Sequence, residues 1–159
     1  MKSIVAFIYW LNRKALMIAG IFLGAMILLS CGNIFLRIVW MPIKGTYELL
    51  GFFSAAVSGL ALGYAQLEAA HTSVDILTSR YSAGAKKIMS AISNIVSCIF
   101  FAISGWQVCV YANTLRTSGE VTETLRIHYY PFTYIVGIGC MVLALASFAQ
   151  FLKIYEKNR

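Results

Sequence analysis

Two carboxylates lie three residues apart in a polar segment of an otherwise apolar chain. Glu120 and Glu123 stand between Arg116 and Arg126. Such a pair of carboxylates is the residue type that general acid–base catalysis uses. The flanking arginines favour a solvated loop in which opposite charges pair at the surface. We therefore interpret this segment as a solvated, salt-bridged loop rather than as a catalytic site.

The residue pattern gives little support for a thiol or metal site. A thiol oxidoreductase needs paired, accessible cysteines, and no C-x-x-C pair occurs. His71 and His128 are predicted to lie at opposite membrane faces, so they cannot ligate one haem or metal ion together. We expect no cofactor and no enzymatic activity. The cysteines all fall within apolar runs and are predicted to serve packing: Cys31, Cys98, Cys109 and Cys140.

The composition predicts that the secondary-structure elements positioning these residues are membrane-spanning helices. Of the 159 residues, 60% are hydrophobic and 12% are charged, whereas a soluble domain carries about 25% charge. Spanning a bilayer takes roughly 17–25 apolar residues in a helix, and backbone groups in lipid must pair internally. The sequence therefore predicts an all-α membrane protein, a single domain over 1–159. Four uncharged runs reach spanning length: 15–36, 49–67, 88–115 and 129–152.

The charge distribution predicts the orientation of these runs. Nine basic residues lie on one side of the predicted membrane and four on the other, and the positive-inside rule places both termini in the cytoplasm. The net charge of +7 is thus mainly a topology signal. The sequence has no basic face with interleaved aromatic residues, which nucleic-acid binding would need, so we expect no nucleic-acid partner. Residues 3–11 are too few to span. They are predicted to form either a short interfacial helix or an N-terminal extension of the first helix.

The runs carry no ionisable residue near their centres. Pumps and ion-coupled carriers place such residues at membrane depth, and transporter binding sites are often marked by proline-interrupted helix pairs, which are absent here. The pattern favours an accessory subunit. The alternatives are a small stand-alone oligomeric carrier or channel and, with less support, a membrane redox protein.

Small residues recur at intervals of four in two of the runs. Positions four apart share a helix face and permit close approach of another helix. The partner helix is either in this chain or in a different protein, and both alternatives stay open. The small residues are Gly20 and Gly24 in the first run and Gly51, Ala55, Gly59 and Gly63 in the second.

Polar residues at motif-like spacing bracket the second run. They are Arg37, Pro42 and Glu48 before it, and His71, Val74 and Asp75 after it. With the segment 45–49 and the Gly59-xxx-Gly63 pair, this pattern resembles the DctQ-like small membrane subunit of tripartite ATP-independent periplasmic (TRAP) transporters. The distinctive part of the resemblance covers about a quarter of the chain.

The resemblance implies a function in the bacterial inner membrane. A periplasmic binding protein captures an organic acid, and a large membrane subunit moves it inward by a sodium-coupled elevator motion. The small subunit binds no substrate. It pairs with the large subunit, as a heterodimer among membrane lipids, and widens the complex's anchored scaffold. The sequence does not name the substrate.

Roles for the flanking residues follow from the predicted topology. Glu48 is expected either to pair with Arg37 at the same membrane face or to cap its own helix, where a negative charge is favoured. His71 and Asp75 are four apart and can pair on one helical turn. They either order the cytoplasmic loop or contact the large subunit. The periplasmic loops, 37–47 and 116–128, are candidate docking surfaces for the binding protein.

Overall fold

The computed structural model describes residues 2–69 and 83–156, and these residues form four long helices. They are α1 (Lys2–Val39), α2 (Thr46–Ala69), α4 (Ala83–Ser118) and α5 (Tyr130–Glu156). Each predicted run falls almost entirely within one helix, and all four helices are long and apolar enough to cross a membrane. The predicted all-α membrane class is therefore confirmed. The predicted cytoplasmic motif residues His71, Val74 and Asp75 lie outside the described residues.

Two of the helices are longer than a bilayer requires. The 38 residues of α1 and the 36 of α4 extend over roughly 57 and 54 Å at 1.5 Å per residue, whereas the hydrocarbon core is about 30 Å thick. These helices must tilt or reach beyond the hydrocarbon. Residues 3–11 continue α1 without a break. Their position relative to the membrane surface stays a prediction.

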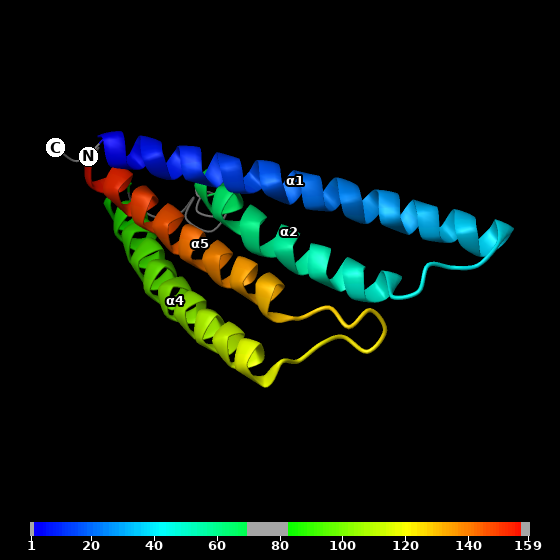
Figure 1. Ribbon diagram of the computed structural model, residues 1–159. Coiled ribbons are helices and arrows are strands. Elements are labelled where there is room, and N and C mark those ends of the chain that lie inside the picture. Colours follow the sequence, from blue (N-terminus) through cyan, green and yellow to red (C-terminus); the bar gives the residue numbers. More distant parts are fainter. Residues whose placement is uncertain (1, 70–82, 157–159) are drawn as a thin grey trace.

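The helices pack side by side in the order α1, α2, α5, α4 (Figure 1). The extensive contacts join α1 to α2, α2 to α5, and α5 to α4, with a smaller contact between α1 and α5. Half of the most apolar stretch of α5 is buried, against about a tenth in α1 and α4. The result is an open row rather than a closed bundle. It leaves broad apolar faces on α1 and α4.

Glycines bring α5 close to both of its main neighbours. A Cβ on Gly139 would collide with the backbone of Gly59 in α2, and a Cβ on Gly137 would lie 2.7 Å from Cys109 Sγ in α4. A Cβ on Gly63 would meet the Asn12 side chain of α1. Gly59 and Gly63 from the predicted stripe therefore pack within this chain. Gly20, Gly24 and Gly51 have open space beside them.

Polar side chains join the helices at the end where α1 begins and α5 finishes. Gln150 Nε2 donates to the carbonyl oxygens of Gln66 (3.2 Å) and Leu67 (2.7 Å), near the end of α2. Gln66 Nε2 in turn donates to Asn94 Oδ1 of α4 at 3.4 Å. Lys153 Nζ of α5 donates to Tyr9 Oη of α1 at 2.6 Å. These bonds tie all four helices together at this end.

Candidate functional site

The loop between α4 and α5 is folded into a defined shape. An isolated antiparallel bridge joins Val121 to His128. Inside it, the Thr122 amide donates to the Ile127 carbonyl at 2.9 Å, and the Ile127 amide donates to the Thr122 hydroxyl at 3.1 Å. Arg126 makes the reversal with φ at +54°, in the left-handed region. Thr122 is consequently buried although it lies in a polar loop.

Glu48 fastens this loop to the start of α2. Its Oε1 accepts a hydrogen bond from the Thr124 amide at 2.8 Å, and its Oε2 accepts one from the Leu125 amide at 3.0 Å. Hydrogen bonds to an ionised carboxylate are stronger than neutral ones. The carboxylate also lies in the first turn of α2, where the helix dipole favours negative charge. We call this arrangement the Glu48 latch.

The connection before α2 is shaped to receive the loop. Gly45 has a φ of +75°, and the Leu125 side chain lies against it where a Cβ would otherwise be. The Thr46 hydroxyl donates to the Ile43 carbonyl at 2.7 Å. Ile43 donates its amide to Asn33 Oδ1 of α1 at 2.8 Å. The α1–α2 connection and the α4–α5 loop therefore form one continuous surface at this end.

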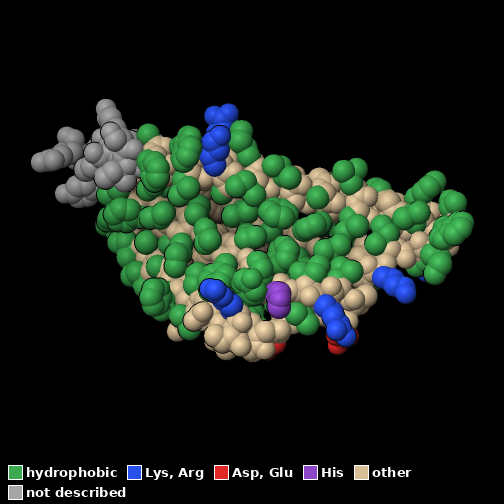
Figure 2. All heavy atoms as spheres, viewed as in Figure 1, with side chains coloured by type: hydrophobic (Ala, Val, Ile, Leu, Met, Phe, Trp, Pro, Cys, Tyr) green, Lys and Arg blue, Asp and Glu red, His purple; other side chains and the backbone are tan. Residues whose placement is uncertain are grey.

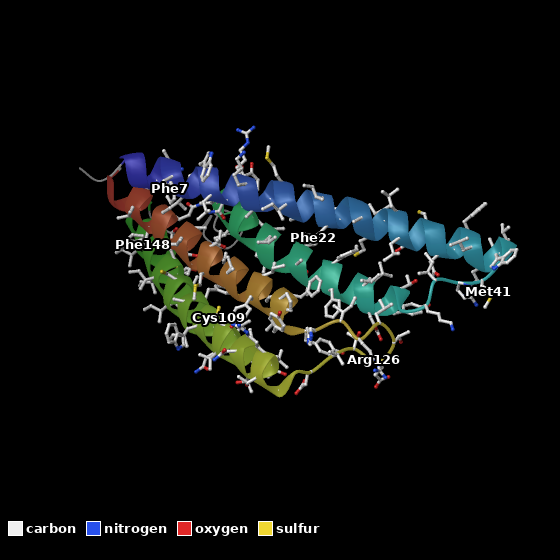
Figure 3. All side chains as sticks on the ribbon, in the orientation of Figure 1. Phe7, Phe22, Met41, Cys109, Arg126 and Phe148 are labelled. Atoms are coloured by element: carbon white, nitrogen blue, oxygen red, sulfur yellow. The ribbon has the colours of Figure 1, made fainter. Side chains whose placement is uncertain are left out.

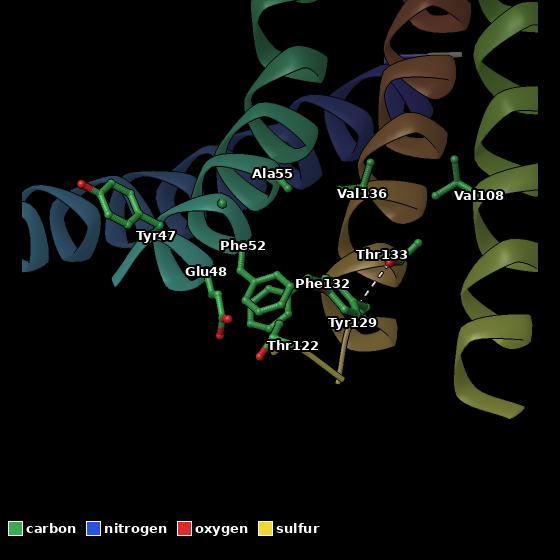
Figure 4. A pocket seen from close by; sticks show the side chains of 11 residues that line it. Tyr47, Glu48, Phe52, Ala55, Val108, Thr122, Tyr129, Phe132, Thr133 and Val136 are labelled. Carbon is green, nitrogen blue, oxygen red and sulfur yellow. Dashed lines mark hydrogen bonds between the residues drawn. The ribbon is translucent and has the colours of Figure 1, made fainter. Parts of the chain in front are cut away.

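Stacked aromatic rings lie beside Glu48 (Figure 4). Phe52 of α2 stacks on Phe132 of α5 with ring centroids 4.2 Å apart and planes 10° apart, and it meets Tyr129 edge-on at 5.5 Å. A cavity of about 410 Å³ lies beside these rings between α2, α4 and α5. Glu48 and Thr122 supply its polar edge, whereas the rest of the lining is mainly apolar.

The predicted partner of Glu48 was Arg37 or its own helix end. In the structure both carboxylate oxygens accept hydrogen bonds from the α4–α5 loop, while Arg37 is exposed in the last turn of α1. Pro42 is also exposed, in the α1–α2 connection. The sequence offered no signal for Thr124 and Leu125, because a backbone amide donor has no residue signature. Their distance along the chain, 76 and 77 residues, also hides the contact.

The four charged residues of the candidate docking segment are exposed: Arg116, Glu120, Glu123 and Arg126. Glu120 accepts a weak hydrogen bond from the Ser118 hydroxyl at 3.4 Å. The loop ties these side chains to one surface without enclosing the two carboxylates in a cleft. Their exposure leaves these side chains accessible to a soluble partner.

The thiols and histidines show no assembled site in the described part of the chain. No group of three or more His, Cys, Asp or Glu side chains there can hold a metal ion. All four cysteines are free. Cys109 and Cys140 lie at the α4–α5 contact beside Gly137 and Gly105. That contact depends on Gly105 and Gly137, which the sequence analysis missed; scanning every run for small residues would have found them.

Figure 2 shows one face of the molecule in space-filling form, and Figure 3 shows its side chains as sticks in the same orientation. The face in view is covered mainly by hydrophobic side chains, with few charged ones. Arg126 is at the tip of the α4–α5 loop, and Met41 lies beyond the end of α1. Four membrane-capable helices with exposed apolar surface define a multi-pass membrane protein.

Comparison with known families identifies which kind of membrane protein this is. Residues 26–157 match the family model described as "Tripartite ATP-independent periplasmic transporters, DctQ component". The match covers well over half of the chain, and the protein belongs to the DctQ family. It is therefore a component of a tripartite transporter. No curated protein and no solved structure matches it.

Proposed function

We propose that this chain is the small scaffold subunit of a sodium-coupled TRAP transporter for organic acids in the bacterial inner membrane. Family membership supports the assignment to the small component. The observation that carries the scaffold role is the open row of helices, whose apolar faces need an external partner. The chain itself binds no substrate in this proposal.

The apolar faces are large enough to require a cover of lipid or protein. On α4, exposed side chains recur on one side of the helix, and most of the surface of each is accessible. They are Ile92, Ile99, Phe100, Ile103 and Trp106. Contiguous apolar surface of this extent marks a membrane or protein interface. On α1, a comparable outward face runs from Met17 to Leu28. We propose that the large subunit covers one of these faces and that lipids cover the other.

The absence of charge within the spans supports a role other than ion coupling. The described spans carry no Asp, Glu, Lys, Arg or His between Lys14 and Arg37 in α1, or between Glu48 and Glu68 in α2. The same holds from Ile88 to Leu115 in α4 and from Pro131 to Leu152 in α5. Coupling ions and anionic substrates need polar or charged groups at membrane depth. In this proposal the large subunit supplies those groups.

The latched loop supports a second part of the proposal, contact with the periplasmic binding protein. A docking loop that is already ordered loses less conformational entropy when it binds. The Glu48 latch provides that order, and the exposed charges of the loop provide the steering that brings a soluble partner to the membrane.

Co-expression with the large membrane subunit of the same transporter tests the proposal. We expect a stable 1:1 complex, with uptake in vesicles only when both chains, the binding protein and a sodium gradient are present. The small chain reconstituted alone should support no uptake. Uptake by the chain alone would instead favour the stand-alone carrier. Failure of the two membrane chains to co-purify would contradict the scaffold role.

A further inference from the structure

We propose that the outward face of α1 near its start binds an anionic phospholipid, with the lipid phosphate between Arg13 and Lys14. Trp10, Arg13, Lys14 and Met17 line a hollow of about 180 Å³ on this face. We call it the α1 hollow. These residues precede the segment 26–157 that matches the family model, so family membership assigns them no role.

The helical periodicity of α1 separates the hollow from the protein interior. Ile8, Asn12, Ala15 and Ala19 recur every three or four residues and are buried against the other helices. The residues lining the hollow recur at the same spacing on the opposite side. Trp10 and Met17 are 56% and 54% exposed, although both are large and apolar. Side chains of this kind avoid water, so the face must meet lipid or protein.

Charge favours an anionic occupant. Arg13 and Lys14 are adjacent and exposed, and the 38 residues of α1 include no Asp or Glu. Figure 2 shows basic side-chain atoms standing out among hydrophobic neighbours at the upper edge of the molecule, where Figure 1 places α1. Lys14 Nζ lies 5.9 Å from the centre of the Trp10 ring, within cation–π range. Arginine and lysine are the side chains that bind phosphate oxygens.

The depth of the hollow matches a lipid rather than a soluble anion. The uncharged run begins at Ala15, directly after the two cations, which places them at headgroup level. Tryptophan prefers the same level, and Phe7 stacks on Trp10 with ring centroids 6.0 Å apart. Below the cations the same face continues with Met17 and Ile21, which is 72% exposed. Phosphate-binding groups therefore adjoin an apolar strip suited to acyl chains.

Fluorescence of a single tryptophan tests this inference without transport or a partner. Full-length protein carrying Trp40→Phe and Trp106→Phe, which leaves only Trp10, is reconstituted into vesicles of equal parts phosphatidylglycerol and phosphatidylcholine, in which either the first or the second lipid is brominated. Bromine quenches nearby indole, so we expect stronger quenching by the anionic lipid. Random orientation of the protein in the vesicles does not affect the measurement, because both leaflets contain the brominated lipid.

Removal of the two cations should strongly reduce the preference for anionic lipid. Each basic residue near a surface contributes roughly a fivefold preference at low salt, so R13Q with K14Q should reduce it by at least an order of magnitude. R37Q with K44Q removes the same charge at the other end and should leave it intact. R13K preserves the charge and should also keep it. Helical content by circular dichroism verifies that each variant is folded.

Three results would overturn the proposal. Equal quenching by the two lipids would show that the face has no headgroup preference. Competition by millimolar inorganic phosphate would show a soluble-anion site instead. Loss of large-subunit co-purification in R13Q with K14Q, without any change in lipid preference, would identify the α1 hollow as a protein contact. The first two results do not depend on the proposed transporter function, whereas the third uses its large subunit.

Discussion

At the scale of single residues, Glu48 joins two segments that are far apart in the chain. Its two oxygens accept the amides of Thr124 and Leu125, and Gly45 makes room for the Leu125 side chain. A carboxylate can accept both bonds at once, whereas an amide side chain has only one acceptor oxygen. The identity of this side chain, and not only its size, therefore determines how firmly the loop is held.

Substitution of Glu48 should loosen the loop and reduce transport. We expect Glu48→Ala to accelerate amide hydrogen exchange at Thr124 and Leu125 and to lower uptake severalfold at equal membrane abundance. Glu48→Gln should have an intermediate effect. The binding protein's affinity for its substrate should stay the same. Glu123→Gln, which changes a carboxylate outside the latch in the same loop, should not alter exchange at these two amides. Unchanged exchange and uptake in Glu48→Ala would contradict this role.

Charge on the exposed side of the same loop should control docking. Reversal of both carboxylates, Glu120→Lys with Glu123→Lys, should change the association rate of the binding protein by about tenfold or more at low salt. The effect should fade as salt screens the charges. Surface plasmon resonance with the reconstituted complex measures this rate. Glu68→Lys, at the opposite end of α2, is the matched control. Equal association rates for the parent protein, the double variant and the Glu68→Lys control would argue against docking at this loop.

At the scale of elements, α5 depends on glycines for its two close contacts. Gly139 crosses Gly59 of α2, and Gly137 lies against Cys109 of α4. Backbone atoms form the obstacle at the first crossing, so they cannot move aside as a flexible side chain would. The small-residue stripe of α2 is thus divided. Gly59 and Gly63 serve the chain's own packing, whereas Gly51 faces open space.

Addition of one methyl group distinguishes these glycines. We expect Gly139→Ala to destabilise the protein by about 1–3 kcal/mol, the usual cost of overpacking, and to lower its thermal unfolding temperature in detergent. Gly20→Ala and Gly51→Ala meet no atom within 4 Å and should leave that temperature nearly unchanged. If all three variants had the same thermal unfolding temperature as the parent protein, the result would contradict the close crossing of α2 and α5.

At the scale of the whole molecule, an even number of spans places the start of α1 and the end of α5 at one end. The Lys153–Tyr9 hydrogen bond holds these ends together, and the Glu48 latch joins the loops at the other end. The open row between them exposes apolar surface along its length. A molecule of this form is suited to lie between lipid and a larger membrane protein.

The predicted orientation can be tested by thiol labelling from outside the cell. In a variant without the native cysteines, Glu123→Cys should react with an impermeant maleimide in intact cells. Glu68→Cys, at the other end of α2, should react only after the cells are permeabilised. The reverse pattern would mean that the termini face the periplasm and that the positive-inside interpretation is wrong.

The sequence alone determined the class of the protein and its spans. Hydropathy is a local property, and a run such as 129–152 must form a helix in lipid wherever its neighbours lie. The motif residues around the second run likewise indicated the family, because side-chain identity can be read without a fold. Arg37, Pro42 and Glu48 could be recognised in this way, although their contacts could not.

Only the tertiary structure decided which residues meet. The partner of Glu48 is a pair of backbone amides more than 70 residues away, and every non-proline residue carries an amide. The partner of Gly59 is another glycine in α5, which periodicity within α2 cannot identify. Hydropathy and spacing act along one segment, whereas the latch and the glycine crossing arise only when separate helices are placed side by side.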